Sequence, residues 1–163
     1  MGQNIDLSTI GMRLGYAFES SAGVRPTGSY TNIPAPKSLP DINPEPNTGE
    51  TTSLNNTEYT SYIPLLKDLG GALGIDMGMS QNGIDTWNTM CATAATKKEA
   101  GLRTWFVFYH PELDISWFLP ADPTKLGFVE AAVNEVWDGT VYITPVGEGG
   151  WFTAIKPEDA ASA

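Results

Sequence analysis

Apolar and polar residues alternate in two stretches of the chain, which is typical of a strand that buries one face. Between residues 10 and 18 the large apolar side chains take the even positions, from Met12 to Phe18. Between residues 71 and 80 the odd positions from 73 to 79 are large and apolar, whereas the other face is small and polar: Ala72, Gly74, Asp76, Gly78 and Ser80. The second stretch therefore predicts a strand whose polar face borders solvent.

One amphipathic helix is predicted between residues 85 and 100. Its apolar residues recur with helical spacing, as Trp87, Met90, Cys91, Ala94 and Ala95. Asp85 suits the N-cap or the first turn, and Lys97 and Lys98 stand where the helix dipole favours cations. Gly101 suits the C-terminal stop. We expect the apolar stripe of this helix to pack on a sheet.

Four more strands are expected after the helix, in antiparallel order. Their residue ranges are 103–109, 114–119, 126–137 and 140–146. The first is apolar on both faces, and turns at residues 110–112 and 138–139 join the strands in pairs. In the range 126–137, Glu130, Ala132 and Asn134 stand at alternate positions and would lie on the same side of a strand, which predicts a second polar face.

A long segment between the two alternating stretches, residues 34–60, is rich in proline and poor in apolar residues. It cannot bury enough apolar surface to order itself, and a loop of this length in a compact domain is usually functional. We therefore expect an arm that becomes ordered on a neighbouring subunit. The residues expected to make its contacts are Leu39, Asp41, Ile42, Leu54 and Tyr59.

Composition and charge narrow the possible functions. The 163 residues suffice for one domain, which we expect to span residues 1–155, followed by a flexible tail at 156–163. With 19 acidic against 9 basic residues the net charge is −10, which argues against stable binding to nucleic acid. A single cysteine, no long apolar run and no signal sequence predict a soluble protein made in the cytoplasm, without a membrane partner.

No constellation for catalysis or cofactor binding stands out. His110 is the single imidazole and no Gly-x-Ser-x-Gly motif accompanies it, so we interpret it as a turn histidine. Cys91 lies on the apolar stripe of the helix, as a small core residue would. The glycines at 70–74 do not match a phosphate-binding loop, and the carboxylates form no D-x-D-x-D-G calcium loop. The sequence predicts neither enzyme activity nor a metal or cofactor.

Four tryptophans leave another interpretation open. Trp105, Trp117, Trp137 and Trp151 could line a platform for a carbohydrate, although tryptophans in strands usually fill a core or a subunit interface. The alternative function is therefore a carbohydrate-binding β-sandwich, which would need exposed, coplanar tryptophans and a signal peptide. A small hydrolase that uses His110 is a third option.

The order of the predicted elements resembles that of one known family. The residues that carry the resemblance are the stretch 11–19 (GMRLGYAFE), the segment 37–42 (KSLPDI) and the segment 62–71 (YIPLLKDLGG), followed by the helix and two hairpins. Over residues 10–155 the chain is similar to the tail tube proteins, or major tail proteins, of long-tailed bacteriophages. The specific part of the resemblance is the order of elements, since this family has no invariant catalytic motif.

The resemblance implies a mainly β fold: a β-sandwich or barrel with one packed helix and a long proline-rich arm. It also implies hexameric rings that stack into a hollow tube in the virion tail, with DNA in transit only. The partners that it implies are a tape measure protein, a tail terminator and baseplate or tail tip proteins. The polar faces predicted above would then line the lumen through Asp76, Glu130 and Asn134, and their acidity would keep DNA phosphates from sticking.

Overall fold

Ten strands and one helix make up the part of the chain that the computed structural model describes. This part comprises residues 7–8, 10–34, 36–43 and 71–159, and the backbone alone of residues 48–50 and 62–64. The strands before the helix are β1 Arg13–Phe18, β2 Thr31–Ile33, β3 Pro36–Ser38, β4 Thr48–Glu50, β5 Tyr62–Pro64 and β6 Leu73–Gly78. The helix α1 is Gln81–Glu99, and the later strands are β7 Thr104–Tyr109, β8 Ile115–Pro123, β9 Asp138–Pro145 and β10 Gly150–Thr153.

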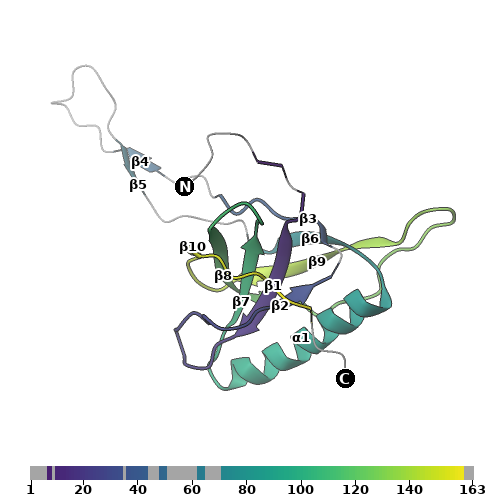
Figure 1. Ribbon diagram of the computed structural model, residues 1–163, viewed down its shortest axis with the longest axis horizontal. Coiled ribbons are helices and arrows are strands. Elements are labelled where there is room, and N and C mark those ends of the chain that lie inside the picture. The colour runs from purple at the N-terminus through teal and green to yellow at the C-terminus, as the bar shows by residue number, and fades with distance from the viewer. Residues whose placement is uncertain are drawn as a thin grey trace, which may run out of the picture.

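The main sheet curls into an open half-barrel, because β8 exchanges one neighbour for another along its length (Figure 1). The strands pair antiparallel in the order β2-β1-β7-β8-β9-β6-β3, with β10 also on β8. β8 pairs with β7 as far as Pro120, and its last three residues, 121–123, pair with β9. The expected mainly β fold with one packed helix is confirmed, while β4 and β5 pair with each other in a separate sheet.

The helix α1 begins earlier than its sequence pattern predicts. Ser80 is the N-cap, and its Oγ accepts a hydrogen bond from the N–H of Gly83 at 3.1 Å. Asp85, predicted as the cap or in the first turn, therefore lies one turn inside the helix. The two lysines predicted for the last turn are confirmed there, and Gly101 follows with a φ of 78°. Within the described residues, no helix combines the length and the apolar character needed to cross a membrane.

The main core fills the space between the curled sheet and α1. Its largest fully buried members are Leu14, Ile33, Ile75, Met77, Trp87, Met90, Phe106, Leu119 and Ile143. The indole N–H of Trp87 donates to the carbonyl of Thr124 at 3.0 Å, so this large side chain is buried without an unpaired donor. The core face predicted for the odd positions from 73 to 79 is confirmed. Leu73, Ile75 and Met77 are buried in this core, and Met79 packs against it.

A second core lies on the opposite face of β7. Its buried members are Tyr30, Trp105, Val107 and Phe118. The guanidinium of Arg25 stacks beside it, with Cζ 4.5 Å from the ring centre of Phe118 and 4.3 Å from that of Phe152. β7 is apolar on both faces, as its sequence predicts, because each face contributes to a core.

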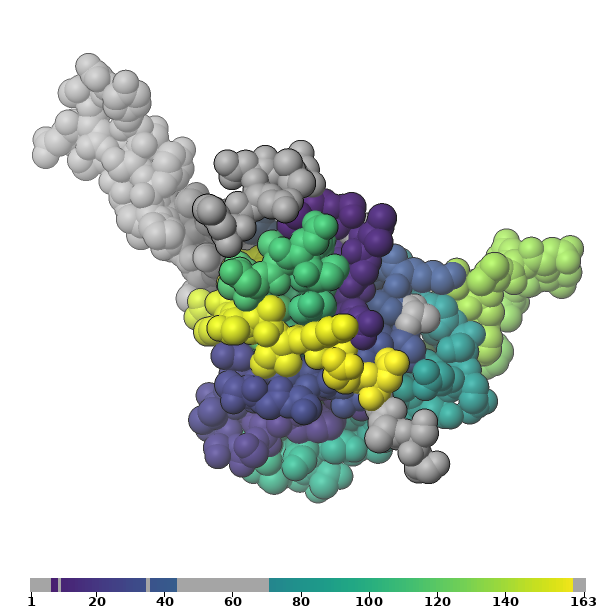
Figure 2. Space-filling model, in the orientation of Figure 1, coloured from purple at the N-terminus to yellow at the C-terminus, as the bar shows by residue number. Residues whose placement is uncertain are grey.

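The C-terminal residues lie along β2 and cover part of one side of the molecule, where Figure 2 shows them in yellow. The N–H of Asn32 donates to the carbonyl of Glu158 at 2.7 Å, and the N–H of Glu158 donates to the carbonyl of Tyr30 at 3.0 Å. Residues 156–159 of the expected flexible tail are therefore bonded to the domain, whereas residues 160–163 lie outside the described residues.

One predicted strand does not form. Residues 126–137 are an irregular loop between β8 and β9. Residues 126–129 lie beside β9, but the ladder between β8 and β9 ends at Pro123, and no described strand pairs with this segment. The strand prediction for this range is wrong, and so is the turn predicted at residues 138–139, which belong to β9. The short strands β2, β3 and β10 were not predicted, because three or four residues are too few for a pattern.

Glu19 is a fully buried carboxylate directly after β1. Its Oε1 accepts hydrogen bonds from the backbone N–H groups of Arg103 at 2.8 Å and Gly23 at 3.3 Å. Its Oε2 accepts from Trp105 Nε1 at 2.8 Å and Arg103 Nε at 3.1 Å. Burial by itself raises the pKa of this carboxyl, but the hydrogen bonds and the charge of Arg103 outweigh burial and lower the pKa. The carboxylate ties the end of β1 to the start of β7.

We expect Glu19→Gln to destabilise the protein by about 3 kcal/mol, because an amide N–H would face buried donors and Arg103 would lose its counter-charge. Since folding lowers the pKa of Glu19, its contribution is present above the ordinary carboxyl pKa and is lost as the pH falls through the folded-state pKa. Urea denaturation at neutral and acidic pH measures both effects, with the exposed Glu112→Gln as control. A variant as stable as the wild type at neutral pH would contradict this role.

Gly15 marks the closest approach of the C-terminal segment to β1. A Cβ at this position would lie 2.6 Å from the Cβ of Pro157, 2.7 Å from its Cγ, and 3.1 Å from the carbonyl of Thr31. Gly15→Ala should therefore destabilise the protein by about 1–3 kcal/mol and increase hydrogen exchange in residues 156–159. Gly28→Ala is the matched control, because a Cβ there meets open space. Equal denaturation midpoints for the two variants would refute the close approach.

Candidate assembly surfaces

The strands β6 and β9 present one polar face to solvent. The residues on this polar face are Gly74, Asp76 and Gly78 of β6, opposite Tyr142, Thr140 and Asp138 of β9. Thr140 Oγ1 donates to Asp76 Oδ1 at 2.7 Å across the pair. The polar parity predicted for Asp76 is confirmed, because its side chain is exposed while its neighbours Ile75 and Met77 are buried. That this face lines a lumen stays a prediction.

Glu130 and Asn134 do not belong to a strand. Both lie on the loop between β8 and β9, and Asn134 has a left-handed backbone conformation with a φ of 64°. Residues of an irregular loop have no two-residue periodicity, so the strand argument that grouped them with Asp76 fails. A lumen position for these two residues has no support from strand geometry.

The loop of residues 124–137 projects from one end of the molecule (Figures 1 and 2). Its most exposed large side chains are Phe128 and Val133, each 87% exposed, and Val136, 77% exposed. The ring of Trp137 packs on Phe128 with centres 5.6 Å apart, and its indole N–H donates to the carbonyl of Val129 at 3.2 Å. These contacts join the two sides of the loop and leave Phe128, Val133 and Val136 largely exposed.

The residues predicted to form an inter-subunit arm divide into two groups. Leu39 and Ile42 pack against the main core of their own chain, and Asp41 between them is exposed. Leu54 and Tyr59 lie outside the described residues. The first part of the predicted arm therefore belongs to the domain, because Leu39 and Ile42 find apolar contacts there without a neighbouring subunit.

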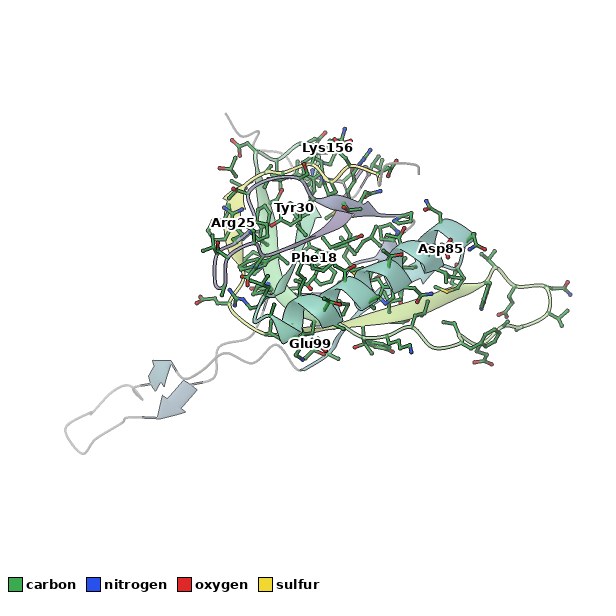
Figure 3. The ribbon with its side chains drawn as sticks, turned by 90° about the horizontal axis from the view of Figure 1, so that it is seen from below. Phe18, Arg25, Tyr30, Asp85, Glu99 and Lys156 are labelled. Carbon is green, nitrogen blue, oxygen red and sulfur yellow. The ribbon has the colours of Figure 1, made fainter. Side chains whose placement is uncertain are left out.

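A hollow of about 520 Å³ opens between the β1–β2 loop and the last turn of α1 (Figure 3). Its charged lining residues are Arg25 and Lys97, and no carboxylate of the described residues lines it. The sequence did not indicate this site, because the two cations are far apart in the chain and neither belongs to a basic run. The one local signal, a lysine pair at the helix end, is explained equally well by the helix dipole.

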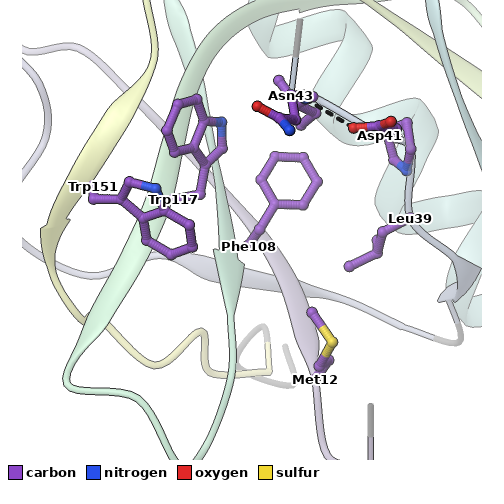
Figure 4. Close-up of a pocket in the computed structure, with 9 residues that line it drawn as sticks. Met12, Leu39, Asp41, Asn43, Phe108, Trp117 and Trp151 are labelled. Carbon is purple, nitrogen blue, oxygen red and sulfur yellow. Dashed lines mark hydrogen bonds between the residues drawn. The ribbon is translucent and has the colours of Figure 1, made fainter. Parts of the chain in front are cut away.

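A second, apolar hollow of about 420 Å³ lies beside residues 39–43 (Figure 4). The rings of Trp117 and Trp151 meet at its wall edge to face, at 73° and with centres 5.5 Å apart. Of the other two tryptophans of the suggested platform, Trp105 is buried in the second core and Trp137 lies on the projecting loop. The four rings share no plane, so the structure gives the carbohydrate interpretation no platform.

His110 adjoins the turn between β7 and β8, and both of its ring nitrogens are engaged. Nδ1 accepts from the N–H of Glu112 at 3.1 Å, so Nε2 carries the proton and donates to the carbonyl of Ser8 at 2.6 Å. Burial raises the pKa of the Cys91 thiol to about 11, which leaves it protonated at neutral pH. In the described ranges, no three His, Cys, Asp or Glu side chains gather as metal ligands.

Comparison with known proteins identifies the fold. No family model matches the sequence, and no curated protein matches it. Among solved structures, a chain in the cryo-EM structure of the anti-feeding prophage (AFP) baseplate, symmetrised six-fold, is similar with a TM-score of 0.57. The two chains share a fold. The similarity covers 93% of this chain and 98% of the other at 12% sequence identity. It therefore extends over nearly the whole of both chains.

Proposed function

We propose that this chain is a structural, non-catalytic subunit of a phage tail or a related tail-like assembly, and that its hexameric rings stack into the tail tube. The observation that carries the proposal is the similarity, over nearly the full length of both chains, to a chain of the anti-feeding prophage baseplate, whose structure is symmetrised six-fold. The order of elements, which resembles that of tail tube proteins, supports the same assignment.

The open half-barrel suits a subunit that continues into its neighbours. A curled sheet with a free edge can extend across a subunit boundary, whereas a closed barrel cannot. On one edge, β2 is covered by the C-terminal segment through the Thr31–Glu158 bridge. On the other edge, β3 is a strand of three residues that pairs only with β6 among the described strands. In a ring, the β3 edge would meet the next subunit.

The polar face of β6 and β9 suits the inner wall of a conduit for DNA. It carries the exposed carboxylate of Asp76, and Lys37 beside it is paired with Asp138 at 2.7 Å. A duplex with one charge per about 1.7 Å would therefore meet a carboxylate and a paired lysine on the described part of this face. One cation outside the ion pairs, Lys125, lines a hollow beside Thr140 and Tyr142. Repulsion between the rings of like charge is screened over about 8–10 Å at physiological salt.

In this proposal the protein acts in the virion tail after synthesis in the host cytoplasm. Its partners would be further copies of itself, a tape measure protein, a tail terminator and baseplate or tail tip proteins, with DNA in transit only. The net charge of −10 favours this transient relation to DNA. The proposal includes no metal and no cofactor.

We expect the purified full-length chain to assemble into rings or tubes, because a ring-forming subunit has self-complementary surfaces at its two sides. Negative-stain electron microscopy and sedimentation velocity over a concentration series measure the assembly, and class averages should have the six-fold symmetry of the similar baseplate structure. A chain that stays monomeric at every concentration, alone and with the other tail proteins, would overturn the proposal.

Asp76→Lys should leave assembly intact but make the tubes retain DNA, because a ring of lysines would replace a ring of carboxylates at the wall. Retention of short duplex DNA by purified tubes measures the effect, and it should weaken as salt rises. The matched control is Glu112→Lys, which makes the same charge change at an exposed turn residue outside this face. If both variants retain the duplex equally, Asp76 does not face the lumen.

A further inference from the structure

The projecting loop combines exposed apolar side chains with acidic ones. We define its acidic tip by five exposed residues: Phe128, Glu130, Val133, Glu135 and Val136. Neither glutamate forms an ion pair with a described residue. Apolar side chains that cluster on an exposed projection mark a contact surface. A partner for this tip has to offer apolar contacts together with positive charge.

The hollow beside the last turn of α1 offers both, and we call it the basic hollow. Its apolar wall includes Phe18 and Val24, and its charged groups are Arg25 and Lys97. Stacking on two phenylalanine rings holds the guanidinium of Arg25 in place. Its volume of about 520 Å³ lies within the range of about 300–1,000 Å³ that is usual for binding pockets.

Cations outside ion pairs are scarce in this acidic protein. Three of the described cations pair with carboxylates, namely Lys37, Lys98 and Arg103. The others are Arg13, Arg25, Lys97, Lys125 and Lys156. Two of these five border the basic hollow, where the nearby carboxylate of Glu19 is fully engaged by Arg103 and Trp105. Glu99 is the exposed acid closest to Lys97 along the helix. The hollow is therefore the place where surplus positive charge gathers.

The acidic tip and the basic hollow lie on opposite sides of the main described domain. Figure 1 shows the loop at one end of the horizontal axis, and Figure 3, turned by 90° about that axis, shows Arg25 on the opposite side of the domain. The tip therefore cannot reach the hollow of its own chain. A contact between unlike surfaces on opposite sides joins copies head to tail, which closes into a ring when the rotation between copies permits it.

We propose that the acidic tip of one copy of this chain docks into the basic hollow of the next copy. The contact covers the apolar side chains of Phe128 and Val133 and brings Glu130 and Glu135 to Arg25 and Lys97. This inference rests on the proposed ring assembly, and it names the two surfaces that hold neighbours together. Charge complementarity also sets the direction, because two tips or two hollows repel each other.

A reciprocal charge reversal tests the contact. The tip variant carries Glu130→Lys and Glu135→Lys, and the hollow variant carries Thr27→Glu and Lys97→Glu, while Arg25 stays in place on its aromatic rings. Each variant alone opposes like charges, so we expect association at least about tenfold weaker than in the wild type. An equimolar mixture restores opposite charges at every contact and should assemble with about wild-type affinity. Recovery in the mixture also shows that both variants are folded.

Cysteine cross-linking tests the position of the contact. Phe128→Cys combined with Thr27→Cys should form disulfides between copies, up to closed rings, when oxidised. Phe128→Cys combined with Glu112→Cys is the control, because Glu112 does not line the hollow. Both cysteine pairs carry Cys91→Ser as well, because the native thiol is free and only partly buried.

The outcomes separate this inference from the proposed function. Weak assembly of each variant, rescue in the mixture and faster cross-linking of the tip–hollow pair support the contact. If each variant alone forms rings as well as the wild type does, the contact is overturned and the assembly proposal still stands. Both are overturned if the wild-type chain does not assemble and the Phe128→Cys/Thr27→Cys variant cross-links no faster than the control variant.

Discussion

The exchange of partners along β8 determines the shape of the whole molecule. The strand pairs with β7 as far as Pro120 and with β9 from Ala121, so a single strand belongs to both halves of the sheet. Pro120 has no N–H to donate, and its carbonyl accepts from the N–H of Val146 at 3.0 Å, beside the point of exchange. A strand that changes neighbours turns the sheet, and a curled sheet encloses a core that one helix can close. The buried Trp87 and the exposed face of β6 and β9 both depend on this curl.

Stability and surface function are divided between the two halves of the sheet. Around β7 both faces are covered, one by α1 and the other by the β1–β2 loop and the C-terminal segment. Four hydrogen bonds to Glu19 tie the end of β1 to the β1–β2 loop and to the start of β7. Around β6 and β9 one face alone is covered, and the other carries small and polar residues. The half of the sheet that is packed on one face alone is therefore the half that keeps an exposed surface for function.

Charge imposes a second constraint on a protein of this composition. With a net charge of −10, copies of the chain repel one another, and an assembly has to place its few cations where they oppose carboxylates. Inside the subunit, Lys37, Lys98 and Arg103 already do so. Arg25 of the β1–β2 loop and Lys97 of the last turn of α1 border a hollow that no described carboxylate lines. In the proposed assembly, the acidity that would keep DNA from adhering to the lumen also makes the few cations important for contacts between subunits.

The sequence by itself determined the elements whose pattern is long or whose ends carry a local signal. Residues 73–78 alternate over a whole strand, and the end of α1 is marked by its lysines and Gly101, because these interactions need no distant partner. Tertiary structure alone decided which alternating segment became a strand, since residues 126–137 alternate as well but form no ladder with a described strand. It also decided that Leu39 and Ile42 pack on their own core, that Glu19 is buried against donors from distant residues, and that Arg25 and Lys97 line one hollow. Pairing and burial are relations between residues far apart in the chain, so a linear pattern can show which face of a strand is polar but not what that face meets.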